Sequence, residues 1–281
     1  MARKTTRNES SLYEMVKTIV VALLLAGVFR SLFFQPFWIP SGSMKQSLLI
    51  GDFIFVNKMA YGYSYASCPS IPFTSITPDK LCGFIKGDNT RIFGRLPERG
   101  DVVVFRHPVT GADYIKRLIG LPGDKLQMKD GFLILNGVQL ETKDEGIFIE
   151  KMEPQGSLGG HPRCSNGAIG LGGICEKERR IETLPNGQSY PTLNIFDGTR
   201  GDNTSVFSVP TGHFFFIGDN RDNSTDSRFP QIFDHSRQTG VGFVKYENIV
   251  GRADRIMFSS AGRSMFYFWT WRSDRFFEAI E

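Results

Sequence analysis

Residues 113–124 decide the fold most clearly and read Asp-Tyr-Ile-Lys-Arg-Leu-Ile-Gly-Leu-Pro-Gly-Asp. Tyr114, Ile115 and Ile119 are residues typical of strands, and a Gly- and Pro-rich turn ends the run, which predicts a buried strand over 114–119. Alternate side chains of a strand share one face, so Tyr114, Lys116 and Leu118 point the same way. Taken alone, Lys116 is more simply a strand lysine whose ammonium reaches water, because lysines are rarely buried.

Short apolar runs of the same kind recur along the chain, at 52–57, 102–105, 132–135 and 214–217. Turn signals separate the runs, and Asn136-Gly137 is a strong hairpin signal. The chain has 30 glycines and 14 prolines, which fits many turns between short strands. This pattern predicts a mainly β fold, an antiparallel barrel or sandwich, with no long helix between the N-terminal region and the C-terminus.

Two polar, turn-rich regions interrupt the strands and are interpreted as insertions, at about 61–98 and 141–209. Each contains one pair of cysteines, and neither pair has the C-x-x-C spacing of zinc or thioredoxin-like sites. Four cysteines allow three pairings, and half-buried free thiols are the alternative to disulfides. In an exported protein we expect two local disulfides, Cys68–Cys82 and Cys164–Cys175.

The N-terminal region carries a membrane signal. Basic residues, including Lys17, precede an uncharged apolar run at 18–29, which is too short to span a bilayer alone. Because Lys17 and Arg30 can extend toward opposite interfaces, 12–34 can span. A cleaved signal peptide would need small residues after the run, where this chain has bulky ones. We therefore expect a cytoplasmic tail at 1–11, an uncleaved transmembrane helix at 12–34 and an exported domain at 35–281.

Charge and the C-terminus add weaker signals. The net charge of +4 is modest and lacks the clustering of a nucleic-acid-binding protein, although it is compatible with an anionic lipid surface. Residues 265–277 are strongly aromatic with interleaved arginines. They fit core packing and a place in the lipid interface about equally well.

Three further motifs accompany residues 113–124 in a fixed order. They read Ile39-Pro-Ser-Gly-Ser-Met44, Arg99-Gly-Asp-Val-Val-Val-Phe105 and Gly218-Asp-Asn-Arg-Asp-Asn-Ser-Thr-Asp-Ser-Arg228. Together, from about Phe33 to about Arg255, they resemble the bacterial type I signal peptidases, membrane-anchored serine proteases that use lysine as the base. One departure is Gln46-Ser47-Leu48, where the family usually has Pro-Thr-Leu.

The resemblance implies a role for each matched position. It makes Ser43 the nucleophile and Lys116 its base, and it places the Ser41 hydroxyl in the oxyanion hole. Ser224 would orient the lysine, and an ion pair between Asp226 and Arg228 would support that loop. A neutral lysine is needed for this chemistry, and burial can lower a lysine pKa by about 3–5 units.

The resemblance also implies a substrate and a setting. We expect an antiparallel β catalytic core, no metal and no cofactor, and a monomer in the bacterial cytoplasmic membrane with its catalytic domain on the periplasmic side. The substrates would be secretory preproteins with small residues one and three positions before the cut. Apolar side chains expected to line the two shallow pockets are Phe37, Ile39, Met44, Leu48, Val104, Tyr114 and Ile115.

Other functions fit the residues less well. A Ser-His-Asp hydrolase would use one of the four histidines, but no Gly-x-Ser-x-Gly elbow is present. A penicillin-binding enzyme would need Ser-x-x-Lys, and Ser43-Met-Lys45 has the wrong spacing. A non-catalytic, membrane-tethered β adaptor that binds exported chains is the alternative from another class, and it would not need Ser43 and Lys116 together.

Overall fold

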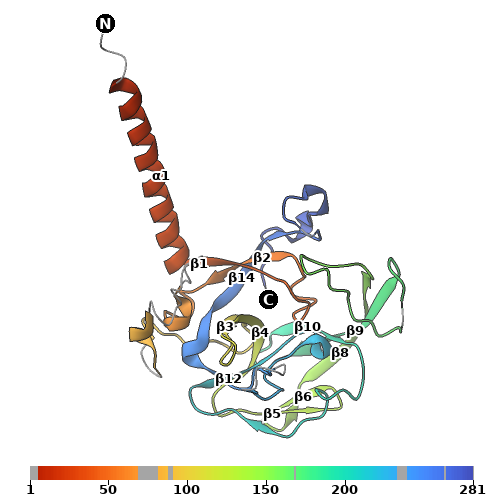
Figure 1. Cartoon of the computed structure of the whole chain (residues 1–281). Helices are drawn as coiled ribbons and strands as arrows, with labels where there is room; N and C mark the ends of the chain where they lie inside the picture. Colours follow the sequence, from red (N-terminus) through yellow and green to blue (C-terminus); the bar gives the residue numbers. More distant parts are fainter. Residues whose placement is uncertain are drawn as a thin grey trace.

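The computed structural model describes residues 6–68, 82–87, 91–167, 169–232, 239–262 and 264–280. The chain opens with helix α1 (Thr6–Leu32), which projects from a body built of strands (Figure 1). Apolar side chains of α1 between Leu12 and Leu25 are about half to two-thirds exposed. Among the residues that the structure describes, no helix is long and apolar enough to cross a membrane.

The main sheet has seven strands in the order β1-β2-β14-β3-β4-β12-β13, and every adjacent pair is antiparallel. The strands are β1 (Phe34–Trp38), β2 (Asp52–Asn57), β3 (Val102–Arg106), β4 (Asp113–Gly120), β12 (His213–Ile217), β13 (Val244–Lys245) and β14 (Ile249–Ser259). Register shifts in β14 and β12 bend the sheet into a curled half-barrel. The antiparallel core is as predicted, whereas the barrel stays open between β1 and β13.

Two smaller sheets complete the body (Figure 1). One has the order β11-β5-β6-β7 and contains β5 (Lys125–Lys129), β6 (Phe132–Leu135), β7 (Val138–Gln139) and β11 (Phe207–Ser208). The other has the order β10-β9-β8 and contains β8 (Glu141–Lys151), β9 (Ile174–Thr183) and β10 (Ser189–Asn194). The predicted hairpin at Asn136-Gly137 joins β6 to β7, and both residues have positive φ, as a type I′ turn requires.

The two insertions differ in their regular structure. The β8-β9-β10 sheet lies within the second insertion, whereas the described residues of the first contain two short 3₁₀ turns and an isolated bridge between Tyr63 and Ile92. In the structure Cys68 is joined to Cys82 and Cys164 is joined to Cys175.

The buried core brings the four motif stretches together. Ile39 and Met44 pack with β2, β3 and β14 side chains in one apolar cluster, while alternate β3 and β12 side chains build a second. Because the first cluster anchors both ends of the segment after β1, residues 39–51 are held against the sheet. We call this segment the nucleophile loop.

The C-terminal aromatic segment packs on the main sheet through only some of its rings. Trp271 and Phe276 pack on Phe258 of β14, with ring centroids 4.8 and 5.3 Å apart. By contrast, Phe266 is 81% exposed and Trp269 is 68% exposed.

Candidate active site

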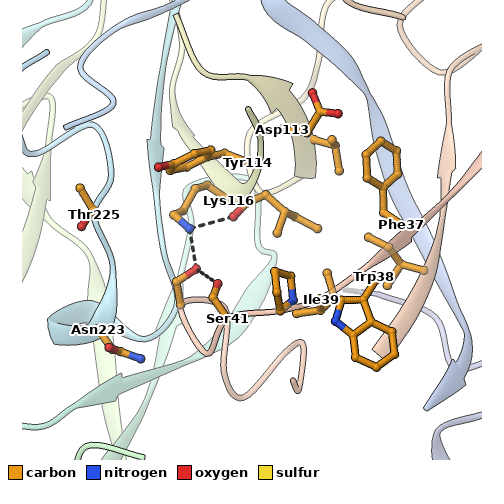
Figure 2. Close-up of a pocket in the computed structure, with 14 residues that line it drawn as sticks. Phe37, Trp38, Ile39, Ser41, Asp113, Tyr114, Lys116, Asn223 and Thr225 are labelled. Carbon is orange, nitrogen blue, oxygen red and sulfur yellow. Dashed lines mark hydrogen bonds between the residues drawn. The ribbon is translucent and has the colours of Figure 1, made fainter. Parts of the chain in front are cut away.

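The nucleophile loop and strand β4 bring Ser43 and Lys116 into contact. Lys116 Nζ lies 2.5 Å from Ser43 Oγ, although the residues are 73 positions apart. Both are buried, at 4% and 7% exposure. Lys116 Nζ also donates to the Ile115 carbonyl at 3.0 Å, and Ser41 Oγ lies 3.4 Å from Ser43 Oγ (Figure 2). The three polar side chains therefore form one continuous hydrogen-bonded line.

Burial makes the Lys116 amine unusually easy to deprotonate. It lowers the pKa of Lys116 to about 8, although the negative charges of Asp226 and Asp219 act in the opposite direction. The face of β4 that carries Lys116 also holds Tyr114, whose ring centroid is 5.8 Å from Nζ. Neutral lysine is therefore accessible near physiological pH.

Asn220 holds the backbone of the nucleophile loop. Its backbone N–H donates to the Ser43 carbonyl at 3.1 Å, and its side-chain Nδ2 donates to the Gly42 carbonyl at 2.9 Å. Asn220 was not predicted as a site residue, because Gly-Asp-Asn occurs three times in the chain. Only the copy at Gly218 continues into the longer third motif, and that continuation was the available signal.

Gly218 lies where no larger residue fits. A Cβ at this position would be 2.2 Å from Ser224 Oγ and 2.7 Å from the Ser43 carbonyl oxygen. The Ser224 side chain and the Ser43 backbone both lie too close to leave space for a Cβ. Glycine is therefore required at this position for steric reasons.

The supporting residues predicted from the third motif form one buried group. Arg228 Nε donates to Asp226 Oδ1 at 2.9 Å, and Ser224 Oγ donates to Asp226 Oδ2 at 2.7 Å. Burial alone would raise the pKa of Asp226, but the adjacent Arg228 holds it below its usual value. Ser224 therefore bonds to the carboxylate of this group, and the hydrogen bonds of Lys116 go to Ser43 and Ile115.

A second buried ion pair, also missed from the sequence, ties β4 to the end of β12. Arg117 donates to both oxygens of Asp219, at 2.9 and 2.8 Å. Ser47 Oγ donates to the same carboxylate at 2.5 Å, so the nucleophile loop joins this pair. Ser47 stands in the stretch where the sequence departs from the family pattern, and it provides a polar tie there.

A pocket of about 350 Å³ opens beside Ser43 and Lys116. Five of the seven predicted lining residues lie in its wall: Phe37, Ile39, Val104, Tyr114 and Ile115 (Figure 2). The prediction is wrong for Met44 and Leu48, which are 0% exposed and pack in the core under the loop. The pocket is also lined by residues that were not predicted, which are Trp38, Ile54, Asp113, Asn223 and Thr225.

The described histidines, His107, His161 and His213, do not line the pocket beside Ser43. His107 is buried, its Nδ1 accepts from the backbone N–H groups of Val109 and Thr110, and its Nε2 lies 3.1 Å from the Gly240 carbonyl. Burial lowers its pKa, which fits a neutral structural imidazole. His235 lies outside the described residues. Within the described part of the chain, no three His, Cys, Asp or Glu side chains gather as a metal site would require.

The arrangement supports acyl transfer. A buried amine touches a serine hydroxyl, and a second hydroxyl lies beside it at the mouth of an apolar pocket. These are the elements of a base, a nucleophile and an oxyanion donor.

Comparisons with known proteins agree with this chemistry. The family described as "Signal peptidase, peptidase S26" matches residues 12–258. The chain is 37% identical over 267 residues to a signal peptidase I of Rickettsia typhi, covering 92% of this chain and 85% of the relative. It is 38% identical over 264 residues to a signal peptidase I of Rickettsia massiliae, covering 92% and 81%.

A crystal structure of a signal peptidase I from Enterococcus faecalis is 27% identical, covers 56% of this chain and 97% of that one, and has a TM-score of 0.28. The family match covers most of the chain, and the Rickettsia typhi relative is 37% identical over 85% of its own length, so these two findings assign the family. The chain belongs to the signal peptidase family, peptidase S26.

Proposed function

We propose that this protein removes signal peptides from exported preproteins, with Ser43 as the nucleophile and Lys116 as its general base. The observation that carries the proposal is the 2.5 Å contact between Lys116 Nζ and Ser43 Oγ in a buried site. A serine hydroxyl needs an adjacent base to react at neutral pH, and a buried amine can be that base.

The reaction begins when neutral Lys116 accepts the proton of Ser43 as Oγ attacks the scissile carbonyl carbon. One N–H of the amine is directed to the Ile115 carbonyl, which turns the nitrogen lone pair toward Ser43. The Ser41 hydroxyl and the Ser43 backbone N–H stabilise the oxyanion of the tetrahedral intermediate.

Two further steps complete the reaction, which are collapse of the intermediate to an ester and hydrolysis of that ester. The carbon–nitrogen bond breaks, and the ammonium of Lys116 gives its proton to the leaving amine, which is the new N-terminus of the mature chain. The signal peptide stays attached to Ser43 as an ester. Lys116 then takes a proton from water as its oxygen attacks the ester carbonyl carbon. The bond from that carbon to Ser43 Oγ breaks, and the ammonium of Lys116 returns the proton to Oγ, which restores both the hydroxyl and the neutral amine.

The pH dependence of cleavage follows from the Lys116 pKa of about 8. Below this value the lysine carries a proton and cannot act as a base, so activity is lost as the pH falls. We expect kcat/KM to decrease about tenfold for each pH unit below the pKa. A rate profile on the purified protein measures this, and an acid limb that stays flat down to about pH 5 would exclude a neutral lysine base.

Replacing Ser41 tests the oxyanion hole. A Ser41→Ala variant keeps the nucleophile and base but loses one donor, so kcat should fall by about 10²–10³ with little change in KM. Steady-state kinetics with a model preprotein separate the two parameters. A rise in KM at unchanged kcat would place Ser41 in ground-state binding instead.

The proposed substrate specificity rests on the shape of the pocket. Bulky side chains such as Phe37 and Ile115 occupy its walls, which leaves space for small groups on the substrate. We propose that alanine-sized residues are preferred one and three positions before the cut. The chain itself has Phe29, Arg30, Leu32 and Phe33 after its apolar segment, so it should escape its own active site.

We also propose that residues 12–34 anchor the protein in the bacterial cytoplasmic membrane as a monomer, with 1–11 in the cytoplasm and 35–281 on the periplasmic side. Two features support this: the exposed apolar surface of α1 and the exposed rings of Phe266 and Trp269. Ser43 is only nine positions after Phe34, a span of at most about 30 Å. The nucleophile would then lie near the membrane surface, where the cleavage site of a preprotein emerges.

The experiment that tests this function is a cleavage assay. The full-length protein in detergent is incubated with a model preprotein, and the products are located by mass spectrometry. We expect one cut, after an alanine-sized residue that follows the apolar segment of the preprotein. Binding of the preprotein without any cut would favour the non-catalytic adaptor.

A further inference from the structure

A second lysine lies beneath the nucleophile and has no part in the mechanism above. Lys45, two positions after Ser43, is 3% exposed. Its aliphatic stem passes under Gly42, where an added Cβ would meet Lys45 Cε at 3.3 Å. The backbone N–H of Lys45 donates to the Gly42 carbonyl at 3.2 Å. The position of Lys45 is therefore coupled to the backbone that carries Ser43.

The ammonium of Lys45 is held by the second insertion, not by the catalytic core. It donates to Glu150 Oε2 of β8 at 2.5 Å and to Gln155 Oε1 at 2.7 Å. Gln155 Nε2 in turn donates to Glu150 Oε2 at 2.7 Å. Lys177 of β9 donates to the other oxygen of Glu150. We call Lys45, Glu150, Gln155 and Lys177 the tether cluster.

The charges of the tether cluster make Glu150 its central member. Two buried ammonium groups share one carboxylate, and the exposed fractions of the Lys45, Lys177 and Glu150 side chains are 4%, 1% and 11%. Burial alone would raise the pKa of Glu150, but attraction to Lys45 and bonding to Lys177 hold it below its usual value. Glu150 is therefore ionised, and without its charge the two ammonium groups would repel each other.

The insertion contacts the nucleophile loop at a second point. A Cβ on Gly156 would lie 2.6 Å from Ile50 Cγ2, so the turn after β8 rests on the far end of the loop. One contact therefore lies in the turn that contains Ser43 and the other lies at the far end of the loop. The position of the nucleophile loop is therefore fixed by contacts with the second insertion as well as by the hydrogen bonds of Asn220.

From these contacts we infer that Glu150 is a positioning residue: through Lys45 it fixes the nucleophile loop, and so the Ser43 hydroxyl, against the inserted β8–β9 sheet. This inference rests on the proposed role of Ser43. Glu150 does not touch the reacting atoms. Its effect is on the placement of Ser43 relative to Lys116, where small displacements cost a large part of the rate.

The test is a double-mutant cycle measured with the full-length protein and a model preprotein. Glu150→Gln keeps the shape of the side chain and removes its charge, and we expect kcat to fall about 10–100-fold with KM within about twofold of wild type. Lys45→Met keeps the volume of the stem and removes one of the two like charges, so it should fold even if Glu150→Gln does not. We expect its kcat to fall about tenfold.

The cycle separates positioning from general destabilisation. In the Lys45→Met background, Glu150→Gln should lower kcat less than about threefold, because Glu150 then has no loop lysine to hold. Glu178→Gln is the matched control: Glu178 pairs with Arg180 in the same insertion, away from the loop, and its loss should leave kcat unchanged.

Three outcomes would overturn the inference. Two of them are wild-type kcat in Glu150→Gln and wild-type kcat in Lys45→Met. The third is a double variant whose fold loss of kcat equals the product of the two single losses. An equal loss of kcat in Glu178→Gln would also overturn it, since the effect would then belong to the fold of the insertion. Activity in Ser43→Ala would instead refute the proposed function, so the two failures are distinguishable.

Discussion

Ser43→Ala and Lys116→Arg are each expected to abolish preprotein cleavage, with kcat lowered on the order of 10⁴-fold or more. The nucleophile and its base act as one unit, so loss of either removes nearly the whole covalent route. Lys116→Arg is the more stringent test of the base, because it keeps the positive charge. A guanidinium does not lose its proton in proteins and cannot accept one from Ser43.

The measurement is single-turnover cleavage of a model preprotein, with thermal unfolding of each variant as the control for folding. Alanine is no larger than serine and fits in the space of the Ser43 side chain, so Ser43→Ala should unfold near the wild-type temperature. Cleavage by Lys116→Arg at a rate within tenfold of wild type would show that the base is another residue.

Gly218→Ala is expected to lower kcat by about 10²-fold or more. The new methyl group would lie 2.2 Å from Ser224 Oγ and 2.7 Å from the Ser43 carbonyl oxygen. Relief of this overlap displaces the nucleophile loop or the Ser224 turn, and a displaced loop disturbs the 2.5 Å contact between Ser43 and Lys116. The expected loss is in kcat, because the pocket that binds substrate is left in place.

Gly83→Ala is the matched control for this change. A Cβ at Gly83 meets nothing within 4 Å, so the variant should retain wild-type kinetics. Wild-type kcat in Gly218→Ala would mean that the loop can shift without harm, and the close packing behind Ser43 would then have no catalytic importance.

Strands β2, β3, β4, β6 and β12 were predictable from local pattern. Residues 52–57, 132–135 and the β-branched run at 102–105 were predicted within one or two residues of β2, β6 and β3, because strand periodicity and turn chemistry are local properties. The opening of the barrel was not predictable in this way. It depends on bulges in β12 and β14, where the register shifts without a clear sign in the sequence.

The site was predictable only in part. Ser43 and Lys116 were identified from the motifs around them, since a single serine or lysine carries little information. The inward side chains of Met44 and Leu48 were not predicted, because an irregular loop has no periodicity that tells core from pocket.

Contacts between segments that are distant in the sequence could not be predicted either. Lys45 and Glu150 are 105 residues apart, and Asn220 meets Gly42 across 178. Such pairs form only when the order of strands in the sheet brings the two segments together. The sequence around one residue of the pair therefore does not indicate which residue it contacts.

Covalent labelling of the full-length protein tests the central claim most directly. A serine-directed acylating probe is added across a range of pH, and the modified residue is located by peptide mass spectrometry. The dyad predicts one adduct, on Ser43, whose rate of formation falls below about pH 8 and is lost in Lys116→Arg. An adduct on another residue, or labelling of Ser43 that is equally fast in Lys116→Arg, would contradict it.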